Sequence, residues 1–177
     1  MMLTRANLIS AFALAFCAAA SSVTNAEPPA AATPEQLAEG KKQYMLICIA
    51  CHQPTGMGLP PVFPPLTKSE YVNGTAERLI AMVLKGNAGP MTIDGKPYNN
   101  IMPGQELVLK DEQIAAVLSF VRQNFGNNAP AIVPEMVAAA RKKFAERKTP
   151  WTEPELKAWK EDAAATATAA PLTKPGS

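Results

Sequence analysis

Two cysteines and a histidine stand together in the chain and have the residue types and spacing of a chemical site. The stretch Cys48-Ile49-Ala50-Cys51-His52 holds the only histidine of the 177 residues and two of the three cysteines. Three kinds of site use such residues: a thioredoxin-like redox pair, a zinc site and a covalent haem attachment site. A redox pair belongs in a strand–helix–strand setting, which this sequence does not predict. A structural zinc ion needs four ligands, and only three are available near this motif.

Covalent haem attachment gives each of the three residues a role. The two thiols add to the vinyl groups of haem as thioethers, and a gap of two residues on a helical turn matches the spacing of those groups. The next residue, His52, is thereby held beneath the iron as an axial ligand. A chance match with two core cysteines is the alternative, and the predicted export, helical pattern and single histidine all favour haem. We therefore expect one haem c per chain, attached through Cys48 and Cys51.

The second axial ligand is expected to be a methionine, because the chain has no second histidine. Three methionines fit poorly, since they lie in predicted helical core stripes or too close to the histidine: Met45, Met82 and Met57. Met91 and Met102 remain, both within the long segment 86–104. Pro103 favours an extended conformation at Met102, which would help to present its sulfur.

The elements that position these residues are predicted to be helical. Thr33 can cap a helix that has Pro34 in its first turn and runs into the cysteine motif. Apolar residues at helical spacing predict two more helices. The connecting segments are rich in glycine and proline or irregular, and no convincing strand alternation is present. The organised part is therefore expected to be all-α over about residues 34–126, with helices at 34–52, 75–84 and 111–125 and loops at 55–66 and 86–104.

The N-terminal residues 1–26 have the pattern of an export signal. One positive charge, Arg5, precedes an apolar run that ends in small residues at Ala26. The run is too short for a membrane-spanning helix, and the bulky Phe16 before Cys17 disfavours lipoprotein processing. We expect cleavage after Ala26 and a periplasmic protein with no integral membrane segment in the mature chain.

Charge and length limit the remaining classes. Removal of the signal peptide lowers the formal net charge from +2 to +1, which gives no general case for nucleic acid as a partner. About 150 residues remain, enough for one domain. Residues 27–33, rich in proline and alanine, are expected to form a linker.

Four motifs make the chain resemble the class I c-type cytochromes. They are CIACHQPTGMGLPPVFPPL, VLKGNAGPM, YNNIMPG and DEQIAAVLSFVRQNFGN. The chain looks most similar to small periplasmic monohaem cytochromes and to cytochrome domains that accompany dehydrogenases and terminal oxidases. The resemblance implies the class I cytochrome c fold over residues 34–128, in which the first helix crosses the last above the haem. Gly40 would permit the close approach, and Met102, in YNNIMPG, matches the family's ligand position in preference to Met91.

Ligation by His52 and Met102 would leave no iron position open for peroxide or oxygen. We therefore expect no enzymatic activity and a single-electron carrier between a dehydrogenase or other donor and a respiratory acceptor such as a terminal oxidase. A haem enzyme or gas-binding sensor in which Met102 dissociates is the alternative, and carbon monoxide binding to the reduced protein would distinguish the two. A backbone carbonyl in the proline-rich loop 59–66 is expected to bond His52 and fix its tautomer.

The C-terminal part is expected to be a helical extension over residues 129–162, followed by a disordered tail at 163–177. A helix should run from Val133 to about Arg147, and Thr152 with Glu155 should form a capping box. The basic run RKKFAERK (141–148) is either a solvated helix face or a docking surface for an acidic partner. Trp151 and Trp159 either fold back on the core or belong to such an interface.

Overall fold

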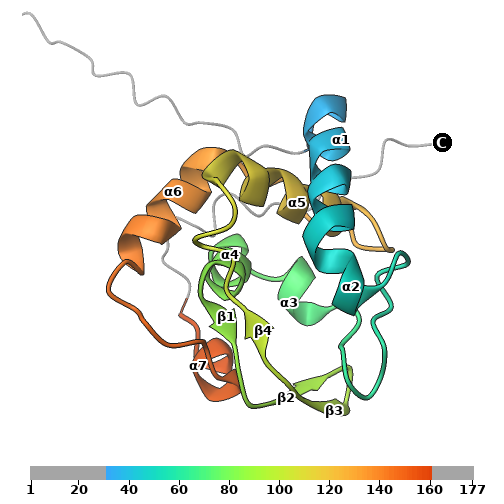
Figure 1. Cartoon of the computed structure of the whole chain (residues 1–177), viewed down its shortest axis with the longest axis vertical. Helices are drawn as coiled ribbons and strands as arrows, with labels where there is room; N and C mark the ends of the chain where they lie inside the picture. Colours follow the sequence, from blue (N-terminus) through green and yellow to red (C-terminus); the bar gives the residue numbers. More distant parts are fainter. Residues whose placement is uncertain (1–30, 161–177) are drawn as a thin grey trace, which may run out of the picture.

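The computed structural model of the chain describes residues 31–160, and the fold is mostly helical, as predicted (Figure 1). The predicted signal peptide and disordered tail lie outside the described residues, as does most of the predicted linker. Among residues 31–160, no helix is long and apolar enough to cross a membrane. The elements are α1 (Pro34–Gln43), the π-helical turn η1 (Tyr44–Cys48), α2 (Ile49–His52), α3 (Glu70–Asn73), α4 (Ala76–Lys85), β1 (Gly86–Asn87), β2 (Pro90–Ile93), β3 (Lys96–Asn99), β4 (Met102–Pro103), α5 (Asp111–Gln123), α6 (Pro134–Lys143) and α7 (Glu153–Lys157).

The first helical run is continuous from α1 through η1 to α2 and carries the cysteine motif at its end, as predicted. It begins at Thr33, whose Oγ1 accepts a hydrogen bond from the backbone N–H of Gln36 at 3.2 Å. In η1 the helix widens, and the N–H of Ile49 donates to the carbonyl of Tyr44, five residues back. The widened turn ends at Cys48, the first residue of the motif, and so helps to set which way the side chains of the motif face.

Helices α1 and α5 cross in close contact, which confirms the role expected for Gly40 (Figure 1). A Cβ atom at Gly40 would collide with the backbone carbonyl of Ala116 and with the side chain of Phe120. Beside the crossing, the rings of Tyr44 and Phe120 pack with their centroids 5.7 Å apart. Glycine therefore lets the two backbones approach to a distance that any side chain would prevent.

The segment 86–104, expected to be irregular, contains four short strands in two antiparallel pairs. β1 pairs with β4, so that Asn87 lies opposite Met102, and β2 pairs with β3 as a hairpin. Strands of two to four residues are too short to show an alternation pattern. The hairpin had a signal in the sequence nevertheless, because Asp94-Gly95 is a two-residue turn pair and both residues have positive φ.

The C-terminal extension packs back onto the domain: α6 lies against α4 and α5, and α7 lies against β2. The helix that was expected to reach Arg147 ends at Lys143. The predicted capping box is present, with the N–H of Thr152 donating to Glu155 at 2.8 Å. Trp151 is 8% exposed and packs at 5.2 Å from the ring of Trp159. Both tryptophans therefore fold back on the core.

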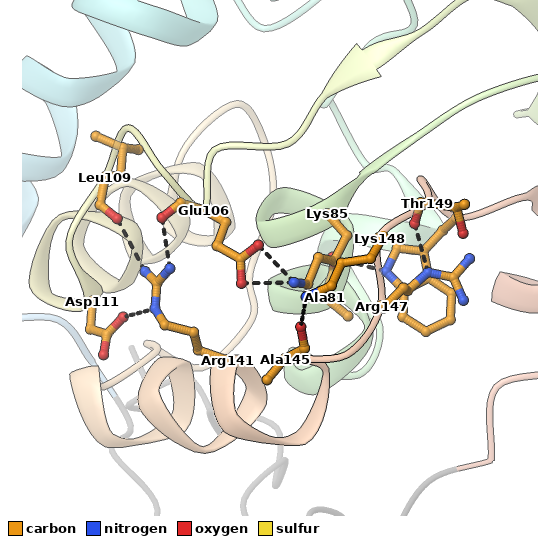
Figure 2. A network of polar contacts seen from close by, with 11 residues as sticks. Ala81, Lys85, Glu106, Leu109, Asp111, Arg141, Ala145, Arg147, Lys148 and Thr149 are labelled. Carbon is orange, nitrogen blue, oxygen red and sulfur yellow. Dashed lines mark hydrogen bonds and ion pairs between the residues drawn. The ribbon is translucent and has the colours of Figure 1, made fainter.

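Most cations of the basic run 141–148 are used within the fold. Arg141 pairs with Asp111, Lys143 with Glu77, and Arg147 with Glu155. Figure 2 shows Arg141 reaching from the extension to Asp111, and Arg147 bonding to Thr149 within the extension. These contacts support the interpretation of the run as part of the fold's own surface. They give no support to the interpretation of the run as a docking surface for an acidic partner.

Candidate functional site

One pocket brings together all four residues that the sequence singled out: Cys48, Cys51, His52 and Met102. The space between the atoms of this pocket amounts to about 1350 Å³, open solvent at its mouth included. Apolar side chains of α4 and α5 form part of its walls, among them Leu79, Val83, Val117, Leu118 and Val121, and the segments 62–72 and 87–109 supply most of the rest. The first helical run and the β1–β4 pair thus place their functional residues around a single apolar cavity.

The two cysteines are free thiols on successive helical turns, and both are partly buried. Burial raises the pKa of the Cys48 thiol to about 11, with the nearby Cys51 adding to the shift. A thiol that stays protonated at neutral pH is a poor redox nucleophile, which counts against a thioredoxin-like pair. Within the described part of the chain, no group of three or more His, Cys, Asp or Glu side chains is placed to hold a metal ion, which counts against zinc.

His52 is held by the proline-rich loop as predicted, with Nδ1 3.0 Å from the backbone carbonyl oxygen of Pro64. A carbonyl only accepts hydrogen bonds, so Nδ1 carries the proton and Nε2 keeps its lone pair. Burial lowers the pKa of His52, and the bond to Pro64 opposes that shift. Gly58 has positive φ, and a Cβ atom built on it would collide with the Pro64 carbonyl. The loop can therefore close only with glycine at this position. The imidazole is therefore neutral and oriented to act as a ligand.

Two methionines of the strand segment line the pocket but differ in their surroundings. Met91 is buried in the side cluster around Trp151, and its sulfur accepts a hydrogen bond from Nδ2 of Asn87 at 2.7 Å. Met102 is half-buried on β4 and packs against the main core cluster, the same cluster that Cys48 packs against. The sulfur of Met91 is thus occupied by a protein donor.

The remaining methionines of the described residues differ in burial. Met82 is buried in the core, as predicted, and also lines the pocket. Met57 is 61% exposed in the loop after His52. Met45 was expected in the core and is instead 49% exposed. Met45 directly follows the buried Tyr44, and each helical residue is turned by about 100° from the one before it, so Met45 faces away from the buried stripe.

Two buried tyrosines provide an independent test of whether this pocket suits a haem. Tyr71 and Tyr98 line it, and each has a hydroxyl group that is buried without a hydrogen-bond partner among residues 31–160. Buried hydroxyls are nearly always paired, so these two call for acceptors within the pocket. The carboxylates of a haem are such acceptors, while its macrocycle suits apolar walls. The residues present therefore fit the group. Sequence reasoning missed both tyrosines, since no local pattern marks a hydroxyl as unpaired.

Comparison with known proteins agrees with this geometry. The profile of the family "Cytochrome c" matches residues 37–125. Cytochrome c-552 from Thermus thermophilus is 34% identical over 129 residues, covering 60% of this chain and 97% of that protein. The cytochrome c subunit of a quinone alcohol dehydrogenase from Gluconobacter oxydans (strain 621H) is 35% identical over 95 residues, 53% of this chain and 20% of that subunit. The cytochrome c subunit of gluconate 2-dehydrogenase from Pantoea cypripedii is 32% identical over 106 residues, 59% and 24% respectively.

A helical domain with a C-x-x-C-H motif at the edge of one apolar pocket defines a haem-binding domain of the c type. The chain belongs to the cytochrome c family. As a cytochrome c it is an electron carrier, and its cysteine pair, Cys48 and Cys51, is consistent with covalent haem c.

Proposed function

We propose that the chain is an exported, periplasmic single-electron carrier whose haem is attached through Cys48 and Cys51 and ligated by His52 and Met102. The observation that carries the proposal is the shared pocket, to which the two cysteines, the oriented imidazole and the Met102 strand all contribute. The bond from His52 Nδ1 to Pro64 leaves Nε2 free to ligate. Met91 is the weaker candidate, because Asn87 already donates to its sulfur.

When bound, the haem supplies the one-electron couple of its iron. The protein's part is to hold that iron between two fixed side chains and away from water. His52 and Met102 together would fill both axial positions, which leaves none for a substrate such as peroxide. The apolar walls from α4 and α5 lower the local dielectric and favour the form of lower net charge. These properties suit electron transfer and give the chain no means to transform a substrate.

The mouth of the pocket suits exchange of electrons with another protein. Val62 and Ile101 line the pocket yet are 44% and 66% exposed, so they place apolar surface at its edge. Apolar side chains gathered at a functional opening are typical of protein–protein contact. The relatives that are dehydrogenase subunits support a dehydrogenase as electron donor. For the acceptor we propose a respiratory protein. Fractionation of cells that make the full chain tests export, since a cytoplasmic holoprotein would contradict it.

Substitution of the two candidate methionines tests the ligand assignment. In the ferric Met102→Ala holoprotein, we expect loss of the charge-transfer band typical of a methionine–iron bond. The reduction potential should fall, because a thioether binds ferrous iron better than ferric iron. Carbon monoxide should bind the reduced variant readily.

Met91→Ala is the matched control, since it removes a buried thioether from the same segment and the same pocket. It should lower stability while leaving the band and the potential nearly unchanged. A band lost in Met91→Ala and kept in Met102→Ala would assign the ligand to the other sulfur. A band kept in both variants would overturn the His/Met proposal.

A further inference from the structure

The C-terminal extension, residues 129–160, contacts the segment that carries Met102 from both sides of that residue. Two of its residues are responsible: Trp151, whose backbone pairs with β1, and Arg141, whose side chain bonds to the segment that follows β4. Neither residue lines the pocket itself, but each bonds to a residue that does: Trp151 pairs with Asn87, and Arg141 donates to the carbonyl of Leu109.

Trp151 extends the β1–β4 pair by a third backbone segment. Its N–H donates to the carbonyl of Gly86, and its carbonyl accepts from the N–H of Ala88, both at 2.9 Å. Asn87 therefore pairs with Trp151 along one edge and with Met102 along the other. Displacement of this backbone segment would expose one edge of β1 and loosen the strand against which β4 is held.

The indole of Trp151 anchors this backbone segment to the domain. Its Nε1 donates to the carbonyl of Ala81 in α4 at 3.0 Å. The guanidinium carbon of Arg147 lies 3.6 Å from the centroid of the Trp151 ring. The rings of Phe144 and Trp151 pack edge to face, with their centroids 5.3 Å apart. A tryptophan fixed on three sides gives the added backbone segment little freedom to move.

Arg141 secures the other side of Met102. Its guanidinium donates to the carbonyls of Glu106 and Leu109, at 2.7 and 3.1 Å, and to a carboxylate oxygen of Asp111 at 2.8 Å (Figure 2). Lys85, at the end of α4, donates to both carboxylate oxygens of Glu106 at 2.7 Å. The chain that follows β4 is thus fastened to both α6 and α4.

We propose that Trp151 and Arg141 are positioning residues that keep the Met102 segment closed over the pocket, so that the extension sets how often Met102 leaves its axial position. This inference rests on the proposed ligation by Met102. A competing ligand reaches the iron only in the fraction of molecules in which Met102 has left. Its apparent affinity therefore reports that fraction, separately from the stability of the whole domain.

Imidazole titration of the ferric holoprotein measures the open fraction directly. Trp151→Ala and Arg141→Gln should each bind imidazole about tenfold more tightly than the unaltered protein, which corresponds to contacts of about 1.4 kcal/mol. Arg141→Lys should return imidazole affinity part of the way to that of the unaltered protein, because a lysine keeps the charge but makes fewer fixed bonds.

Ile132→Ala is the control: it truncates a fully buried side chain of the extension whose backbone is bonded to Ser119 of α5. It should lower stability and leave imidazole affinity within about twofold of the original.

Met102→Ala, titrated in parallel, separates the two proposals. If it loses the charge-transfer band while Trp151→Ala and Arg141→Gln bind imidazole no more tightly than Ile132→Ala, the positioning role is wrong and the ligand assignment stands. If Met102→Ala keeps the band, both are overturned. Should Trp151→Ala fail to fold, Trp151→Phe with Arg141→Gln decides the question. The phenylalanine keeps the backbone pairing and loses the bond to Ala81, so an increase of about threefold is expected.

Discussion

Substitution of Gly40 by alanine separates two physical effects that predict opposite signs. In a helix interior, alanine is favoured over glycine by about 1 kcal/mol, so intrinsic propensity alone would stabilise the variant. Against this, the new Cβ would meet the Ala116 carbonyl and the Cβ of Phe120 at the α1–α5 crossing. Overpacking of this kind costs about 1–3 kcal/mol, and a helical backbone carbonyl has little room to move. We expect a net loss of up to about 2 kcal/mol in the free energy of unfolding.

The assay is denaturant unfolding of the ferric holoprotein, followed by far-ultraviolet circular dichroism. Ala38→Gly provides the matched control, because Ala38 is exposed in the same helix and reports propensity without packing. That control should lose about 1 kcal/mol. If Gly40→Ala gains stability by the amount that Ala38→Gly loses, the crossing tolerates a methyl group and the close-approach argument is wrong.

Three further predictions follow from buried groups. Burial raises the pKa of Tyr44 to about 12 from 10.0. Its neutral hydroxyl therefore contributes fully to the free energy of unfolding below pH 10, and this contribution should be lost as the pH rises toward 12. Tyr44→Phe should flatten this decline, and an unchanged slope would contradict it. Ser119, fully buried, donates to the carbonyl of Ile132 and accepts from its N–H. Ser119→Ala leaves the N–H of Ile132 unpaired, while Nε2 of Gln36 still donates to the Ile132 carbonyl at 2.8 Å. The variant should lose about 1–3 kcal/mol in denaturant unfolding, whereas a loss under about 0.5 kcal/mol would contradict it. Cys48→Ala with Cys51→Ala should lose haem on acid–acetone extraction, and haem retained by this double variant would refute covalent attachment.

The sequence predicted those parts of the site that depend on local chemistry. The cysteine motif, its place at the end of the first helix and the carbonyl partner of His52 are local, because each follows from residue types within about a dozen positions of chain. The close crossing at Gly40 came from the family resemblance and is confirmed by the packing against Ala116. Ligation by Met102 stays a prediction, supported by the shared pocket.

The parts that could not be predicted depend on contacts between distant segments. The pairing of Trp151 with Asn87 joins residues far apart in sequence, and a single tryptophan carries no information about which strand edge it meets. The unpaired hydroxyls of Tyr71 and Tyr98 likewise become visible only when their neighbours are known. The hairpin at Asp94-Gly95 differs from these cases, because the sequence does contain its turn signal. Its strands were not predicted because they are too short to show an alternation of apolar and polar residues.

The π-helical turn has a consequence for which insertions and deletions the chain can accept. A π-helical turn holds one residue more than an α-helical turn, so deletion of one residue within Tyr44–Cys48 would restore a regular helix and improve local hydrogen bonding. The residues after the deletion would stay nearly in place, because five residues at the wider π-helical spacing turn the chain about as far as four residues at about 100° each. With α1 locked against α5 at Gly40, Cys51 and His52 would keep facing the cavity. A deletion in the regular helix between Gly40 and Tyr44 would instead turn the motif by about 100°. The widened turn is therefore the place where this helical run can lose one residue and keep the haem site.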